Sequence, residues 1–131
     1  AESYTDSKIA SGDATATPTY KALDVNAVAQ AVASSVNATA STNTTVFSWN
    51  TADFSAGKFL VKIAAGVHTQ VIEVLATLDT AGNVHVTEYA EVSTNGSMGT
   101  ITVAVASGVA AVVANTTSNA TVNLFGTLLV A

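Results

Sequence analysis

The chain has 131 residues, and only 10% of them are charged, whereas an average globular domain carries about 25%. It contains four lysines, no arginine, no cysteine and nine Asp or Glu residues, which gives a formal net charge of −5. An acidic chain without arginine is poorly suited to gripping phosphate groups, so nucleic acid is not expected as a partner. The lack of cysteine excludes disulfides and thiolate metal sites.

A membrane-spanning segment is not expected either, although 49% of the residues are hydrophobic. The longest apolar stretch runs from Val103 to Ala114 and is interrupted by Ser107 and Gly108. A spanning helix needs about 18 or more consecutive apolar residues. The first residues lack a basic segment followed by an apolar one, so no secretory signal is expected in the printed sequence.

Residues 1–22 are polar, include the only proline, Pro18, and show no helical or alternating apolar pattern. Such a segment buries too little to offset the entropy lost on ordering it, which is about 1–2 kcal/mol per residue for the backbone. It is predicted to be an extended N-terminal arm. Two interpretations stay open: a disordered terminus, or an arm that docks on another subunit through residues around Tyr4, Ile9 and Tyr20.

The segment from Leu23 to Val36 fits two patterns. Val25, Val28, Val32 and Val36 fall near helical spacing, and Asp24 could cap such a helix. Three of the four valines also share one face of a strand, and a Thr- and Asn-rich stretch follows. We favour a strand over a helix here.

From Thr44 onward the pattern is that of β-strands. Phe59, Val61 and Ile63 alternate with Lys58, Leu60 and Lys62, which predicts a strand with one buried and one half-solvated face. The segment from Thr100 to Ala106 alternates in the same way. The segment from Asp79 to Asn83 has the composition of a turn, so Leu78 is expected to pair with Val84 across a hairpin. Short strands about 10 residues apart predict an all-β fold, an antiparallel β-sandwich of seven to eight strands, jelly-roll or immunoglobulin-like, formed by residues 23–131 as one domain.

The core of this sandwich is predicted from the alternation of apolar residues. It comprises Phe47, Phe59, Val61, Ile63, Val74, Leu75, Val86, Ile101, Val103, Val112, Leu124 and Leu128.

The chain contains two histidines, His68 and His85. In the expected hairpin, His85 lies opposite Thr77, on the face that also carries Glu73. A histidine near a glutamate can bind a metal or move a proton, but a zinc site needs three or four ligands and the sequence does not visibly supply them. We therefore expect surface histidines and no metal or cofactor.

Glu88 and Glu91 flank Tyr89 and are the other candidate pair. Glycosidases use two carboxylates about 5–9.5 Å apart across a sugar-binding cleft. In a regular strand, residues three apart point to opposite faces, so these two are not expected to act together. No nucleophile or phosphate-loop motif occurs, and the chain is predicted not to be an enzyme.

Several short segments then carry a resemblance to a known module. The first is Trp49-Asn50-Thr51-Ala52-Asp53-Phe54-Ser55-Ala56-Gly57-Lys58-Phe59-Leu60-Val61-Lys62-Ile63. The next are Thr69-Gln70-Val71-Ile72-Glu73-Val74-Leu75, Thr87-Glu88-Tyr89 and Thr94-Asn95-Gly96-Ser97-Met98-Gly99-Thr100. The last is Asn119-Ala120-Thr121-Val122-Asn123-Leu124-Phe125-Gly126-Thr127-Leu128-Leu129. Together they resemble a β-module of virion structural proteins from cyanophages and related marine tailed phages, over residues 44–131. The arginine usual in that module is absent, since Ser55-Ala56-Gly57-Lys58 keeps only the lysine.

The resemblance implies a β-sandwich building block of a virus particle, with no catalytic residues to carry over. A single module after one arm suits a capsid decoration (cement) protein on the outer capsid surface. Its expected partners are the major capsid protein and copies of itself, with a trimer favoured by analogy. The alternatives are a tail-fibre or other tail component that contacts host glycans, and a secreted bacterial adhesin or filament subunit.

Overall fold

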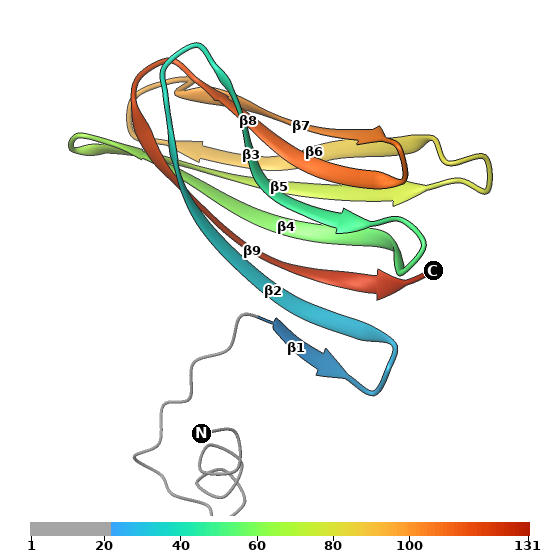
Figure 1. The fold of residues 1–131 in the computed structure, drawn as a ribbon. Coiled ribbons are helices and arrows are strands. Elements are labelled where there is room, and N and C mark those ends of the chain that lie inside the picture. Colours follow the sequence, from blue (N-terminus) through green and yellow to red (C-terminus); the bar gives the residue numbers. More distant parts are fainter. Residues whose placement is uncertain (1–21) are drawn as a thin grey trace, which may run out of the picture.

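The computed structural model describes residues 22–131, which form nine β-strands and no helix (Figure 1). The strands are β1 (Ala22–Val25), β2 (Ala29–Ala38), β3 (Asn43–Asn50), β4 (Phe54–Ala65), β5 (His68–Leu78), β6 (Val84–Ser93), β7 (Gly99–Ala106), β8 (Val109–Thr116) and β9 (Ala120–Val130). None of the described residues belongs to a helix that could cross a membrane. The all-β prediction is confirmed.

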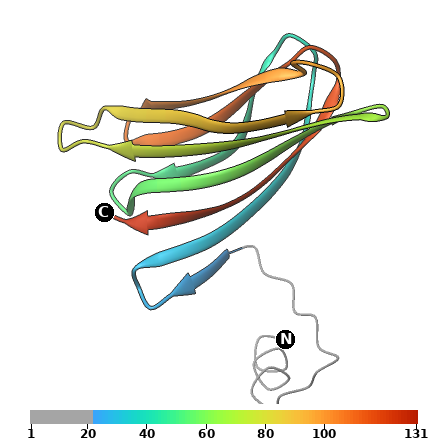
Figure 2. The same ribbon diagram turned by 180° about the vertical axis from the view of Figure 1, so that it is seen from behind.

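The strands form two antiparallel sheets that pack as a sandwich. The large sheet has the order β1-β2-β9-β4-β5-β6, and the small sheet has the order β3-β8-β7. The small sheet packs against one face of the large one, and β1 lies at the edge of the large sheet away from the small sheet (Figures 1 and 2). One face of the large sheet is therefore covered and its other face is open.

The chain crosses between the sheets in pairs. β2 pairs with β9 in the large sheet, and their continuations β3 and β8 pair in the small sheet. The two long segments β2–β3 and β8–β9 thus pass from one sheet to the other side by side, as in a jelly roll. The strands β4, β5 and β6 remain in the large sheet as a meander.

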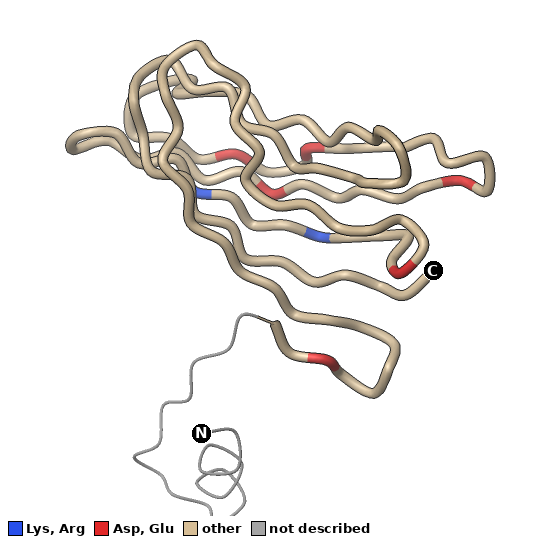
Figure 3. The backbone as a smooth tube through the Cα atoms, in the orientation of Figure 1, with Lys and Arg blue, Asp and Glu red and all other residues tan. Residues whose placement is uncertain are grey.

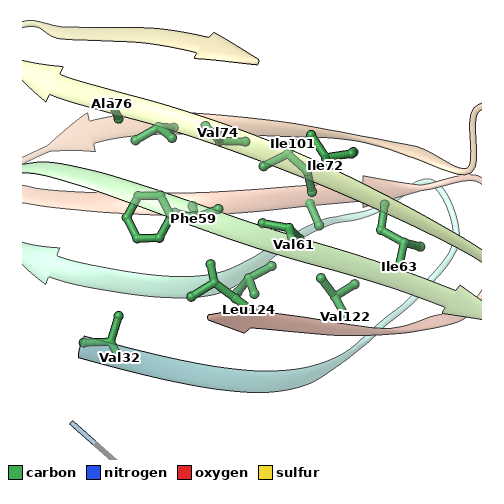
Figure 4. Close-up of a cluster of buried hydrophobic side chains, with 14 of the residues drawn as sticks. Val32, Phe59, Val61, Ile63, Ile72, Val74, Ala76, Ile101, Val122 and Leu124 are labelled. Carbon is green, nitrogen blue, oxygen red and sulfur yellow. The ribbon is translucent and has the colours of Figure 1, made fainter. Parts of the chain in front are cut away.

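The core lies between the sheets and follows the alternation of the strands. In β4, Phe59, Val61 and Ile63 are fully buried while the residues between them are exposed. Figure 4 shows these side chains meeting apolar residues of β2, β5, β7 and β9. Phe59 also packs against Trp49 of β3, with ring centroids 5.5 Å apart.

Two glycines make room for the Phe59 ring. A methyl group at Gly57 would lie 2.5 Å from the Phe59 Cζ atom, and one at Gly126 would lie 2.5 Å from its Cδ1 atom. Real side chains do not approach this closely, so an alanine at either position displaces the ring or the backbone.

Most of the predicted core is confirmed, but three residues differ. Leu75 and Val86 are exposed, at 48% and 42%, and Phe47 is only half-buried. Leu75 points to the open face of the large sheet, because on β5 the buried residues are Gln70, Ile72, Val74 and Ala76. Val86 points inward, but its strand is the outermost strand of the large sheet, where the narrower small sheet does not reach.

The segment from Leu23 to Val36 is extended, as favoured, but it holds two strands instead of one. Asn26 and Ala27 both adopt positive φ, 53° and 54°, and the Val28 amide donates to the Val25 carbonyl at 3.1 Å. This is the type I′ geometry of a tight hairpin, which turns the chain back between β1 and β2. The additional strand β1 accounts for nine strands where seven to eight were expected.

The expected arm over residues 1–22 lies outside the described residues, apart from Ala22, which begins β1. Tyr4, Ile9 and Tyr20 lie in the part that is not described, and their role stays a prediction.

Candidate binding surface

The open side of the large sheet carries many large apolar side chains. We call this surface the outer apolar face; its members are 44% to 74% exposed. They are Leu23, Val25, Leu60, Leu75, Tyr89, Val92, Phe125 and Leu129. They come from all strands of the large sheet except β2, which contributes the smaller Ala31 and Ala33 to the same side. Exposed apolar patches of this extent on soluble proteins commonly mark interaction sites.

The strand register fixes how these residues lie beside one another. Leu60 of β4 is opposite Phe125 on β9 and opposite Glu73 on β5. Lys58 is one step along β4 on the same side and is opposite Leu75. A depression of about 310 Å³ on this face is lined by Lys58, Leu60, Glu73, Phe125 and neighbouring residues. The centre of the face thus combines an apolar floor with charges of both signs.

Both lysines among residues 22–131 lie on the outer apolar face. Lys58 and Lys62 are exposed on β4, with Leu60 between them, and Figure 3 shows β4 as the strand with both positive charges. The Lys58 Nζ atom lies 6.0 Å from the centre of the Tyr89 ring on β6. The remaining charged groups of residues 22–131 are carboxylates, and only Glu73 among them lies between these lysines and β6.

The exposed face of the small sheet is different in kind. Its outward residues include Thr45, Ser48, Thr100, Thr102 and Ala104 on β3 and β7, and the central strand β8 adds Val109, Ala111 and Val113. The two sides of the sandwich therefore offer a neighbouring molecule different chemistry.

The structure does not bring His85 and Glu73 together. His85 is opposite Thr77, as predicted, and Glu73 lies four residues away along β5, which is about 13 Å of strand. The His85 Nε2 atom instead lies 3.2 Å from Oδ2 of Asp79. His68 lies elsewhere, with Nδ1 3.2 Å from the Thr94 hydroxyl.

Asp79 organises the turn between β5 and β6. Its Oδ1 atom accepts the amide hydrogens of Ala81 and Asn83, each at 2.9 Å. The hydrogen bond from the Asn83 amide, followed by that with His85, lowers the pKa of Asp79 from 3.8 to about 2. This turn holds a stable carboxylate, and among residues 22–131 no group of three or more His, Asp or Glu side chains could hold a metal.

The expectation for Glu88 and Glu91 is wrong in one respect, because β6 is not regular. A bulge at Tyr89 places Glu88 opposite Val74 and Glu91 opposite Ile72, so both glutamates share the inward side of the strand. Both are exposed on this outermost strand. Glu91 accepts a hydrogen bond from the amide of buried Gln70 at 2.5 Å, and Gln70 accepts one from the Met98 amide at 2.7 Å. Glu91 is therefore linked through Gln70 to the segment that connects β6 to β7.

A larger depression, of about 610 Å³, lies between the β1–β2 hairpin and the start of β4. Asp24, Asp53, Gln30 and Phe54 are among the residues that line it. Asp24 is engaged locally, since its Oδ1 atom accepts the Ala27 amide at 3.0 Å in the hairpin turn.

The sequence pattern did not single out the outer apolar face. It placed Leu60 on a half-solvated face and assigned Leu75 to the core. The available signal was that Phe125 and Leu129 lie in phase with Asn123 and Thr127, and out of phase with the buried residues of β9.

Comparison with known proteins gives a likeness of fold. No family model matches the chain, and no curated protein matches it. The crystal structure of the tailspike protein of Acinetobacter baumannii phage AM24 is similar over 79% of this chain, with a TM-score of 0.50 and 9% sequence identity. The match spans 26% of the tailspike chain, about a quarter of that protein's length. At this identity the likeness shows a shared β-architecture.

Proposed function

We propose that this chain is a non-enzymatic structural protein of a bacteriophage particle, a capsid decoration protein that binds the outer capsid surface. The observation that carries the proposal is the outer apolar face, which a free monomer would leave in water. A small sandwich with one covered and one open sheet face is suited to permanent assembly with neighbours, which removes that apolar area from solvent.

Three further features support a virion role. The resemblance of residues 44–131 to a β-module of phage structural proteins concerns the same strands, β3 to β9, that form most of the sandwich. The fold is similar to part of a phage tailspike. Three of the exposed carboxylates, Asp24, Asp79 and Glu91, are engaged in turns and strand connections, which fits a structural role.

The likeness to a tailspike favours a second candidate, a module of a tail component. In that case the sandwich is one structural unit of a fibre or spike and contacts the host surface. The decoration role predicts many copies over the capsid, and the tail role predicts a few copies at one vertex.

The test is the composition of purified particles of the phage that encodes the chain. Particles are separated from free protein on a density gradient, and the abundance of this chain relative to the major capsid protein is measured by quantitative mass spectrometry. A decoration protein is expected at a copy number comparable to that of the major capsid protein, since it repeats with the capsid lattice. An abundance that corresponds to a few copies per particle supports the tail alternative. Absence of the chain from particles overturns both the decoration role and the tail role.

A further inference from the structure

We infer that the outer apolar face binds the same face of a second copy of this chain, through a two-fold contact that places β4 of one copy over β5 of the other. This inference deepens the proposed function by naming a partner, and it concerns a contact that forms in solution without a particle. The observation behind it is the pattern of charges at the centre of the face.

The two central strands carry complementary patterns. Along β4 the outward residues run Lys58, Leu60, Lys62, which is a leucine between two positive charges. Opposite them on β5 stand Leu75, Glu73 and Val71, which is a negative charge between two apolar residues. The charges on β4 of one copy would therefore be neutralised by β5 of a facing copy, and those on β5 by its β4.

A two-fold axis that runs along the strands, midway between β4 and β5, brings these patterns together. Such a rotation exchanges β4 and β5 but keeps each residue's position along the strand direction. Leu60 and Glu73 are cross-strand neighbours within one copy, so the partner's Glu73 lies over Leu60. Adjacent outward residues on a strand are about 6.7 Å apart, so that carboxylate stands between Lys58 and Lys62 and within reach of both side chains. The contact is isologous, and the same arrangement occurs twice.

The same rotation also sets the largest outward side chain of β9 over a small one. It places β9 of one copy over β6 of the other, so Phe125 faces Ala90, which occupies the equivalent row. Leu129 lies in the row of His85, and Thr127 in the row of Thr87, so these pairs are of similar size. The most prominent ring of the face thus meets the smallest outward side chain of β6.

Other placements of the axis are less favourable. An axis over β4 stacks each lysine on its own copy, and an axis over β5 stacks Glu73 on itself. An axis between β9 and β4 sets Leu60 over Phe125, but it gathers four lysines around them and leaves Glu73 over Ala33. Like charges in a contact between proteins oppose association, so among axes that run along the strands the charges select the one between β4 and β5.

The test uses charge reversal in the full-length chain. Two variants are made, Glu73→Lys and the double variant Lys58→Glu/Lys62→Glu, with Glu88→Lys as a control that changes the net charge as Glu73→Lys does but lies on the other side of the large sheet. Self-association is measured by sedimentation equilibrium, and circular dichroism verifies that each variant keeps its β-structure.

The unaltered chain and Glu88→Lys are expected to form dimers. Each reversed variant alone is expected to self-associate about 100-fold more weakly, because like charges then face each other. An equimolar mixture of the two reversed variants is expected to regain a dimer that contains one copy of each.

Four outcomes overturn the inference. They are an unaltered chain that is monomeric at every concentration, one that forms only trimers, a Glu73→Lys variant that associates as well as the unaltered chain, and a mixture that does not recover. Because these measurements need no particle, the inference can fail while the chain is still found on virions, and the reverse also holds.

Discussion

At the scale of single residues, two phenylalanines of the large sheet differ in solvent exposure. Phe59 is fully buried on β4, whereas Phe125 is 56% exposed on β9. Replacing Phe59 by alanine removes a ring that packs against Trp49 and is expected to lower the free energy of unfolding by about 3–5 kcal/mol.

The matched control is Phe125→Ala, measured by urea unfolding at low protein concentration. It is expected to change the free energy of unfolding by less than about 0.5 kcal/mol, since its ring already faces water. Equal losses for the two variants would show that the inward and outward sides of the large sheet are assigned wrongly.

Asp79 gives a prediction about pH. Its pKa in the folded protein is about 2, below the ordinary value of 3.8, so its ionised form is favoured by folding. The stabilisation is complete above about pH 4 and is lost as the pH falls through 2. The urea midpoint of the unaltered chain should therefore fall more steeply between pH 4.5 and 2 than that of Asp79→Asn, and parallel curves would contradict the role of this carboxylate.

At the scale of elements, much of the pattern could be predicted from the sequence, because it depends on local alternation and turn composition. The pairing of Leu78 with Val84 and of Thr77 with His85 follows from the turn residues between Asp79 and Asn83, and both pairs are present. The burial of Phe59, Val61 and Ile63 follows from their period of two.

The differences arise where a strand departs from its simple pattern or where its neighbours matter. The bulge at Tyr89 places Glu91 on the opposite side of β6 from the one expected for a regular strand, and no turn residue in the sequence indicates the bulge. The hairpin turn at Asn26 and Ala27 lacks the glycine usual in such turns. The sequence therefore did not indicate that β1 is a separate strand. The exposure of Val86 depends on the width of the small sheet, and only the complete fold determines that width.

The β1–β2 hairpin yields a prediction from its strained turn. Ala27 has φ of 54°, a conformation that costs an alanine about 1 kcal/mol and a glycine almost nothing. Ala27→Gly is therefore expected to raise the melting temperature. Ala31→Gly, within β2, is expected to lower it, because the strand there gains only flexibility. A lower melting temperature for Ala27→Gly would contradict the type I′ turn.

At the scale of the whole molecule, the described residues 22–131 contain both sheets and the core between them. Removing residues 1–21 is therefore expected to leave a soluble protein that unfolds in one cooperative transition. If the segment around Tyr4, Ile9 and Tyr20 contacts a neighbouring subunit, the shortened chain should no longer bind particles, as a sedimentation assay with particles would show. Equal binding by the shortened and full-length chains would remove the arm from the proposal.

The account of the whole molecule rests on the contrast between the sides of the sandwich. The small sheet presents mainly threonine, serine, alanine and valine to solvent, and the large sheet presents leucine, phenylalanine and the lysines of the described residues. A protein with these two faces can use the outer apolar face to contact a second copy and leave the face of the small sheet free for other contacts. This contrast supports the proposed role in assembly.

The most direct test is the location of the chain on the intact particle, determined by electron cryomicroscopy of the phage that encodes it. The account predicts a β-sandwich density of this size repeated across the outer capsid surface, with the exposed side of the large sheet covered by a neighbour. Density confined to the tail, or a repeated sandwich whose outer apolar face is open to solvent, would contradict it.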